Sequence, residues 1–533
     1  MNQWALWVVA LLALCGCISD NSTAPIVVAP TEFPTSTLGL DYAAEAQTLD
    51  VADGATLVLD AAPVKKSLMG RDVRMLAYNG SIPGPVIRVK QGAEVIVRLK
   101  NRTGFPTTLH AHGVRMDYHF DGAANFSQKP VAEGDSFTYH LKFPDAGLFW
   151  YHAHEREDWS QEMGLYGNIM VVPSDSNYWR PVHREQVLML DDFYLDTLAT
   201  KPSFQVGETD HTMMGRFGNL YLINGDTAFN MTVKRNEVVR FYATNSSNTR
   251  VFNVGFADSS LGVRNVKIVG TDNGQYEYFD MAPAALVAPG ERKIFEAWFD
   301  KPGTVYLIHH ILKSLYTNDS IVVIGRVTVL TDSVDGAYGR RFLAEDSSLQ
   351  TLKAMDSLRT WFDPKLPMDK ELLLTGKMGK MAGMPGMKVS AAQGEPISTE
   401  AKGIEWRDHM AEMNAASTTE NMDWIIRDVG TGLENHDIAW AFKQGDKVRI
   451  RIRNDSASVH PMPHPIHFHG QRFLILAVNG KANLNKAWKD TYLIGTKETV
   501  DILLDASNPG GWMAHCHIAE HAEDMMMFHF RVD

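Results

Sequence analysis

The segment Gly92-Ala-Glu-Val-Ile-Val-Arg-Leu-Lys-Asn101 decides the fold, because its pattern returns twice along the chain. Residues 445–454 repeat it as Gly-x-x-Val-x-Ile-x-Ile-x-Asn, and residues 236–245 carry a weaker copy, Asn-x-x-Val-x-Phe-x-Ala-x-Asn. Each copy alternates apolar and polar residues, which is typical of a strand with one buried face that ends in a turn. Three copies predict three similar β domains.

A second repeated strand follows each copy of the first. It begins at a glycine, and two residues that are two positions apart follow at the same distance from that glycine in every copy. These are His152 and His154 after Gly147, Ile308 and His310 after Gly303, and His515 and His517 after Gly510. The fold class is therefore predicted to be all-β, with three sandwiches and little helix. The middle copy has only one His of the pair, so we expect the outer domains to supply a metal site together and the middle domain to act as a spacer.

Histidines gather in four short clusters along the chain. The clusters hold ten of its twenty histidines: His110 and His112; His152 and His154; His464, His467 and His469; and His515, His517 and His521. A single histidine is ordinarily structural, but four clusters of this kind indicate metal binding. A structural zinc site is excluded, because four ligands, usually including several cysteines, close such a site.

Cys516 lies between two histidines, and His521 and Met526 follow it. A thiolate, imidazoles and a weak thioether are the ligands of a blue-copper electron-transfer site. Neighbouring strand residues point to opposite faces, so His515 and His517 must serve other metal ions. Electrons that arrive at the Cys516 site would thus have a short covalent path to these other ions.

These motifs resemble those of the multicopper oxidases, the family of laccases, ferroxidases and cuprous oxidases. The resemblance implies three cupredoxin-like Greek-key β-sandwich domains, four copper ions and dioxygen as the electron acceptor. Because a substrate gives one electron at a time and dioxygen needs four to become water, we hypothesise an oxidase that makes four one-electron oxidations per dioxygen. The ligand sets that it implies are His464, Cys516, His521 and Met526 for type 1 copper; His110 and His467 for type 2; and His112, His152, His154, His469, His515 and His517 for the type 3 pair.

Two acidic residues are candidates for moving protons. Asp121 lies where the family has a carboxylate beside the type 2 copper, so we expect a proton donor or a residue that orients water; an ordinary Asp-Gly turn is the alternative. Many bacterial relatives carry a Glu directly after the last type 1 histidine. Here that position is Ala522, so the role is vacant or passes to Glu523.

The electron donor is suggested by methionine. Met378, Met381, Met384 and Met387 recur at every third residue, and Met462 lies two residues before His464. Thioethers favour Cu(I), and such Met-rich stretches resemble those of bacterial cuprous oxidases. We therefore expect Cu(I) or another metal ion as substrate, in copper tolerance. The alternatives are laccase-like oxidation of phenols, a linker that merely contains Met, and a non-enzymatic copper-sequestering lipoprotein.

The N-terminus resembles an export signal. The apolar run from Trp4 to Cys15 fits a signal peptide, and Leu14 to Cys17 resembles a lipoprotein box with a lipid anchor on Cys17. A simple cleaved signal is the alternative, and no Lys or Arg precedes the run. We expect a periplasmic or cell-envelope lipoprotein that touches the membrane only through this anchor.

Length and charge complete the expected organisation. A chain of 533 residues exceeds a single core, and a net charge of −12 argues against nucleic-acid binding. We expect a monomer with dioxygen and a reducing metal ion or phenol as partners. The predicted parts are a signal at 1–17, a tether at 18–40, domains at 41–180, 181–335 and 403–533, and a Met-rich linker at 336–402.

Overall fold

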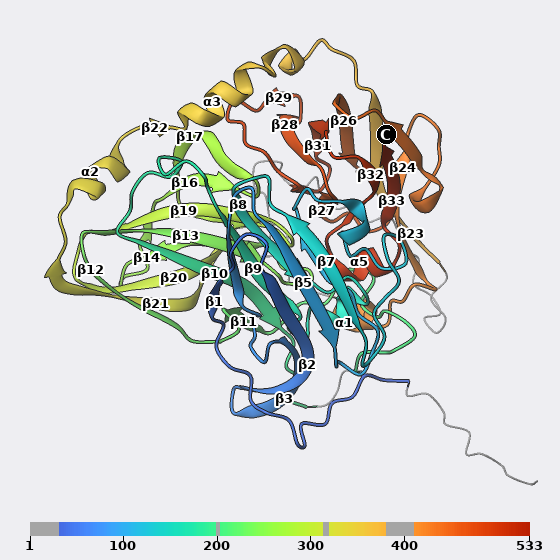
Figure 1. The fold of residues 1–533 in the computed structure, drawn as a ribbon, viewed down its shortest axis with the longest axis horizontal. Coiled ribbons are helices and arrows are strands. Elements are labelled where there is room, and N and C mark those ends of the chain that lie inside the picture. Colours follow the sequence, from blue (N-terminus) through green and yellow to red (C-terminus); the bar gives the residue numbers. More distant parts are fainter. Residues whose placement is uncertain (1–30, 199–202, 313–318, 380–409) are drawn as a thin grey trace, which may run out of the picture.

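The computed structural model describes residues 31–198, 203–312, 319–379 and 410–533. Three β-sandwiches follow one another, coloured blue to cyan, green to yellow and orange to red (Figure 1). The predicted all-β fold is confirmed. Within the described ranges, no helix is both long and apolar enough to cross a bilayer. The signal, Cys17 and three of the four spaced methionines lie outside these ranges.

The first sandwich packs the sheet β1-β4-β9-β8-β6 against the sheet β3-β2-β5-β7. Its core is a continuous cluster of buried side chains from both sheets, such as Leu99 and Tyr151. Its strands are β1 (Thr48–Asp50), β2 (Thr56–Leu68), β3 (Arg71–Tyr78), β4 (Val86–Lys90), β5 (Glu94–Asn101), β6 (His110–His112), β7 (Ser136–Lys142), β8 (Gly147–His152) and β9 (Tyr166–Val172).

The middle sandwich packs β11-β10-β13-β19-β16-β17-β22 against β12-β21-β20-β14-β15, and β18 pairs with β14. Phe241 and Phe295 stack inside its core. Its strands are β10 (Arg184–Phe193), β11 (Leu220–Ile223), β12 (Phe229–Arg235), β13 (Glu237–Asn245), β14 (Phe252–Ala257), β15 (Val263–Arg264), β16 (Val266–Thr271), β17 (Gly274–Ala282), β18 (Ala285–Val287), β19 (Arg292–Phe299), β20 (Gly303–Ile311), β21 (Ser320–Ser333) and β22 (Asp346–Ser347).

The third sandwich packs β24-β23-β26-β31-β28-β29 against β25-β33-β32-β27-β30. Cys516 and Met526 belong to its buried core. Its strands are β23 (Lys370–Met378), β24 (Met422–Asp428), β25 (Ala439–Phe442), β26 (Asp446–Asn454), β27 (His464–Phe468), β28 (Arg472–Val478), β29 (Lys481–Ala482), β30 (Thr491–Ile494), β31 (Thr499–Ala506), β32 (Gly510–Cys516) and β33 (Met527–Val532).

Helices in the described ranges are short and lie in the connections. Helices α2 and α3 run along the outside of the molecule from the middle to the third sandwich, and α1 lies close to α5 (Figure 1). The helices are α1 (Glu157–Ser160), α2 (Ala337–Leu343), α3 (Leu349–Asp356), α4 (Ala411–Ala415) and α5 (Ala519–Glu523), with 3-10 turns η1 (Tyr118–Phe120), η2 (Arg359–Phe362) and η3 (Asn435–Asp437).

The asparagine that ends each copy of the first repeat does the same work in all three sandwiches. Its buried side-chain amide donates to two backbone carbonyls that come later in the chain: Asn101 to Phe105 and Val131, Asn245 to Arg250 and Val287, and Asn454 to Met462 and Ile494. Buried carbonyls need a donor, and this amide supplies one to each of the two segments. The repeat thus marks a packing requirement of the sandwich.

Two predicted boundaries differ from the structure. Phe33, in the predicted tether, is buried and stacks on Trp159 of the first sandwich with ring centroids 3.7 Å apart. Strand β23, in the predicted linker, pairs with β24 and β26 of the third sandwich. Its buried Leu372 and Leu374 alternate as a strand requires, but the Gly- and Met-rich sequence that follows hides this pattern.

Candidate metal centre

The histidine pairs meet where the first and third sandwiches face each other. In the first, β6 pairs with β8, so that His110 lies opposite His152. In the third, β27 pairs with β32, so that His467 lies opposite His515. Strand pairing therefore brings two histidine motifs side by side in each outer sandwich. The contact between these sandwiches then brings all four motifs together.

The ring nitrogens and Cys516 form compact groups whose possible ligand atoms lie within 4.8 Å of one another. All members of these groups are buried. The groups are His110, His112 and His467; His112, His152 and His517; His154, His469 and His515; His110, Asp121 and His469; and His464, Cys516 and His521. The structure thus brings all ten histidines of the four sequence clusters into two neighbouring sites.

Most of these imidazoles are oriented by a hydrogen bond from the nitrogen that faces away from the group. Nδ1 donates to a backbone carbonyl in four of them: His110 to Asp121, His152 to Ala153, His467 to Asp490 and His515 to Cys516, over 2.7–2.9 Å. This bond fixes the tautomer and leaves Nε2 as the metal-binding atom. Side-chain contacts do the same for His154, which faces Glu157, and His469, which faces Asp121.

His112 is oriented in the reverse sense. Its Nε2 lies 3.2 Å from an Asp490 carboxylate oxygen and 3.0 Å from the Thr491 hydroxyl, so Nδ1 faces the group. His469 and His515 point their Nε2 atoms at each other, 3.0 Å apart.

The donor set fits copper. Buried polar atoms are nearly always hydrogen-bonded, yet the inward nitrogens of His110, His112, His152, His154, His467 and His517 have no hydrogen-bond partner among the residues that the structure describes. Burial, together with the neighbouring imidazoles, holds the pKa of His112 and His467 well below the usual range. Neutral imidazoles that converge on one point are what a metal ion requires.

The Cys516 site is separate and more apolar. Cys516 Sγ lies 3.6 Å from His464 Nδ1 and 3.7 Å from His521 Nδ1. The Met526 carbonyl accepts the Cys516 amide over 3.0 Å, and the Met526 side chain is buried in the same core. Burial raises the pKa of the Cys516 thiol, so a thiolate here needs a bound cation.

Asp121 lies at the edge of the histidine groups. Its Oδ2 accepts from His469 Nδ1 over 2.8 Å, and its carbonyl accepts from His110 Nδ1 over 2.7 Å. Burial opposes ionisation, but the imidazoles of His469 and His110 outweigh it and lower the pKa of the Asp121 carboxyl. Asp121 therefore contacts one histidine from each outer sandwich, His469 through its carboxylate and His110 through its backbone carbonyl.

Glu523 reaches the histidines through Glu157, a residue that the sequence did not single out. A Glu523 carboxylate oxygen accepts the Glu157 amide over 2.8 Å, where α1 meets α5. The buried Glu157 carboxylate in turn lies 2.9 Å from His154 Nδ1. The position of Glu157 three residues after His154 was the signal by which the sequence could have identified it. Its partner Glu523 is 366 residues away, so nothing in the local sequence indicated that contact.

The Cys516 site is covered by Trp424, which the sequence also did not single out. Its ring lies 4.3 Å from that of His521 and 4.9 Å from that of His464, between centroids. The indole nitrogen donates to the carbonyl of Thr212, in a loop of the middle domain. His464 and His521 are consequently 1% and 0% exposed.

A second segment holds that loop in place. Met213 and Met214 donate their amides to Ser417 Oγ and Asn414 Oδ1, and the Asn414 amide donates to the Gly215 carbonyl. The loop 209–215 and the segment 410–418 together are called the cover here.

The candidate substrate methionines divide into three groups. Met462 is 1% exposed and belongs to the core of the third sandwich. Met378 ends β23 and pairs with Met422, two residues before Trp424. Met381, Met384 and Met387 lie outside the described residues.

Comparisons with known proteins agree with this arrangement. Family models described as "Multicopper oxidase" match residues 62–176 and 407–533. The chain is 26% identical to Multicopper oxidase MmcO of Mycobacterium tuberculosis, over 90% of this chain and 87% of that one. It is 25% identical to Copper resistance protein A of Escherichia coli (93% and 95%) and 23% identical to Laccase-3 of Oryza sativa (87% and 89%).

The fold is similar to a solved structure, the multicopper oxidase of Campylobacter jejuni described as a metallo-oxidase. The TM-score is 0.67 at 21% identity, over 94% of this chain and 99% of that one. Together with the buried histidine groups, these matches establish the cofactor as copper of types 1, 2 and 3. The chain belongs to the multicopper oxidases, copper-dependent oxidoreductases that couple four one-electron oxidations to the reduction of dioxygen to water.

Proposed function

We propose that this multicopper oxidase oxidises a small reduced metal ion, Cu(I) first, in copper tolerance. The observation that carries the proposal is the burial of His464 and His521 beneath Trp424 and the cover. A phenol ring would have to displace packed side chains to approach these imidazoles, whereas a metal ion needs only a few soft ligands near the cover.

The copper ligands are proposed as the sequence suggested. Type 1 copper is assigned to His464, Cys516, His521 and Met526; type 2 to His110 and His467; type 3 to His112, His152, His154, His469, His515 and His517. When bound, the copper ions carry single electrons from the substrate to dioxygen. The protein buries the histidines, fixes their tautomers and excludes water from Cys516.

Methionines near the cover support Cu(I) as the substrate. Met213 and Met214 lie in the loop that contacts Trp424, and Met378 begins the run of regularly spaced methionines. Thioethers bind Cu(I) in preference to harder ions. We propose that Met381, Met384 and Met387 collect the ion; Met462, sealed in the core, is assigned to packing around the type 1 site.

The test replaces Met381, Met384 and Met387 together with Leu and leaves Met378, because its side chain packs against the core of the third sandwich. Oxygen consumption is measured with Cu(I), Fe(II) and a phenol. We expect KM for Cu(I) to rise while phenol and Fe(II) oxidation stay unchanged. Met281→Leu, an exposed methionine of the middle domain, is the matched control. Unchanged Cu(I) kinetics in the triple variant contradict the proposal.

Two other functions give different results in the same experiment. A laccase-like enzyme turns over the phenol fastest and is indifferent to the triple substitution. A copper-sequestering protein binds Cu(I) and consumes no oxygen with any of the three donors.

For Asp121 we propose a role in orienting His110 and His469. For Glu523 we propose a role in proton supply, from its position beside Glu157, whose carboxylate faces His154. We further propose export and a lipid anchor on Cys17. Mass spectrometry of the mature N-terminus tests the anchor, with Cys17→Ser as the unlipidated reference.

A further inference from the structure

One guanidinium of the middle domain joins all three domains beside the histidine groups. Arg292, at the start of β19, donates from Nε to the Leu148 carbonyl of the first sandwich over 2.9 Å. Nη1 donates to the Gly290 carbonyl over 3.0 Å and to Asp490 of the third sandwich over 2.7 Å, and Nη2 donates to the other Asp490 oxygen. Both side chains are completely buried.

Asp490 carries this contact to two histidines of different domains. Its carboxylate oxygen Oδ1 accepts from His112 Nε2, and its backbone carbonyl accepts from His467 Nδ1. The Thr491 hydroxyl donates to the same oxygen over 2.9 Å. The orientation of one carboxylate thus determines which nitrogen of His112 faces the copper site.

The backbone around the pair leaves no room for adjustment. A Cβ on Gly113, the residue after His112, would lie 2.3 Å from Asp490 Oδ2 and 2.7 Å from Arg292 Nη2. A Cβ on Gly290 would lie 2.6 Å from His517 Cδ2. The middle domain therefore packs directly on the histidine groups and is more than the spacer that the sequence suggested.

Other buried charges surround the ion pair of Arg292 and Asp490. Lys489 Nζ lies 2.9 Å from Asp272 and 3.1 Å from Glu291, and all three are buried. Buried ion pairs add little net stability over apolar packing, because desolvation offsets the attraction. Buried charges around Arg292 and Asp490 therefore indicate that these side chains must be held in a defined orientation, and not only shielded from water.

We propose that Arg292 is a positioning residue for the type 2 and type 3 copper ions, acting through Asp490 on His112 and His467. Two parallel N–H bonds hold a carboxylate in one plane, which the single charge of a lysine cannot do. The described residues of the middle domain contribute no member to the histidine groups, yet this domain shapes the site. The proposal does not depend on which substrate the enzyme oxidises.

The test is Arg292→Lys in the full chain, reconstituted with copper. Copper affinity is measured by competition with a chelator, and the type 2 and type 3 ions are followed by electron paramagnetic resonance and near-ultraviolet absorption. Loss of an outer-sphere partner lowers metal affinity by about 10–100-fold, and we expect this for the type 2 and type 3 positions. The blue absorption of the Cys516 site, which Arg292 does not touch, should stay unchanged.

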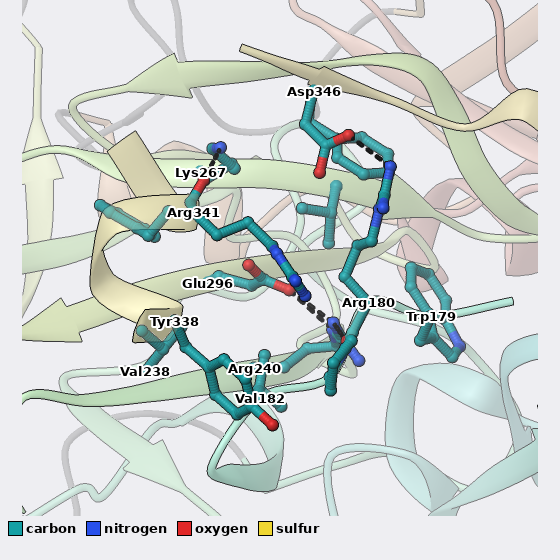
Figure 2. Close-up of a pocket in the computed structure, with 14 residues that line it drawn as sticks. Trp179, Arg180, Val182, Val238, Arg240, Lys267, Glu296, Tyr338, Arg341 and Asp346 are labelled. Atoms are coloured by element: carbon teal, nitrogen blue, oxygen red, sulfur yellow. Dashed lines mark hydrogen bonds and ion pairs between the residues drawn. The ribbon is translucent and has the colours of Figure 1, made fainter. Parts of the chain in front are cut away.

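The matched control is Arg240→Lys in the same domain. Arg240 is buried against Glu296, 2.6 Å away, in a pocket beneath α2 that holds none of the ten clustered histidines (Figure 2). It loses the same kind of ion pair, so it reports the effect on folding alone. We expect its type 2 and type 3 signals to match those of the wild type.

Asp490→Asn is the second variant, and it decides the matter if Arg292→Lys does not fold. It keeps the size of the side chain but loses the charge that pairs with Arg292. A weakened type 2 and type 3 site with an intact blue site in Arg292→Lys, or in Asp490→Asn where Arg292→Lys does not fold, supports the proposal. Wild-type affinity and resonance spectra in the folded variants overturn it, as does an equal loss in Arg240→Lys.

Discussion

The ring of Trp424 lies over the imidazole of His521, with centroids 4.3 Å apart and planes inclined by 29°. The same ring meets His464 edge-on, and its nitrogen is tied to the middle domain at Thr212. Trp424, on the edge strand β24 of the third sandwich, thus packs against both His464 and His521, and the middle domain holds it there.

Trp424→Phe should widen the range of substrates. Phenylalanine loses the bond to Thr212 and fills less space, so a phenol can come closer to His521. We expect kcat/KM for a phenol to rise about ten-fold, equivalent to about 1.4 kcal/mol, with little change for Cu(I). Trp440→Phe, a buried tryptophan of the same sandwich, is the control. An equal gain in both variants, or none in Trp424→Phe, contradicts the prediction.

Cys516→Ser should remove one copper ion and leave the others. The His464, Cys516 and His521 group shares no residue with the remaining groups. A serine hydroxyl does not replace the thiolate that blue copper requires. We expect the blue absorption to disappear, the copper content to fall by one ion per chain, and the near-ultraviolet absorption to remain. Loss of two or more ions on elemental analysis would show that the sites are coupled in assembly.

The contact between Glu157 and His154 should make the stability of the copper-free protein depend on pH. Burial opposes the charge on His154, but Glu157 outweighs it and raises the pKa of His154 from 6.5 to about 9. The same contact lowers the pKa of Glu157. A raised histidine pKa stabilises the folded state fully below pH 6.5, and this contribution is lost as the pH rises through 9.

Glu157→Gln therefore should destabilise the copper-free protein most between pH 4.5, the ordinary value for Glu, and pH 6.5, and little above pH 9. Urea unfolding of both proteins across this range is the measurement. A difference in stability that does not vary with pH would assign the contact to packing alone.

Asn101→Ala should destabilise the first sandwich. It removes the amide that donates to the Phe105 and Val131 carbonyls and the oxygen that accepts from the Thr103 amide and hydroxyl. Each buried hydrogen bond contributes about 0.5–1.5 kcal/mol net, so we expect a loss of about 2–5 kcal/mol, measured by calorimetry. Asn230→Ala, an exposed asparagine of the middle domain, should change little. Equal effects of the two substitutions would mean that the repeat has no packing role.

The repeats, the fold class and the histidine groups could be predicted from sequence because they depend on local period. A strand with one apolar face alternates every two residues, and so does a pair of histidines on one face. The buried Asn at the end of each repeat copy was visible for the same reason. Strand β23 was missed because its short pattern merges into a Gly- and Met-rich stretch.

Local sequence carries no record of which distant side chain will lie beside a given histidine. The motifs alone identified the ten histidines, Cys516 and the copper chemistry, because those residues lie within a few positions of one another. Only the packing of three sandwiches brought Arg292 and Asp490 against His112, Glu523 to Glu157, and Trp424 over His521. These contacts join residues far apart in the chain, and they orient and enclose the side chains that the sequence motifs had already singled out.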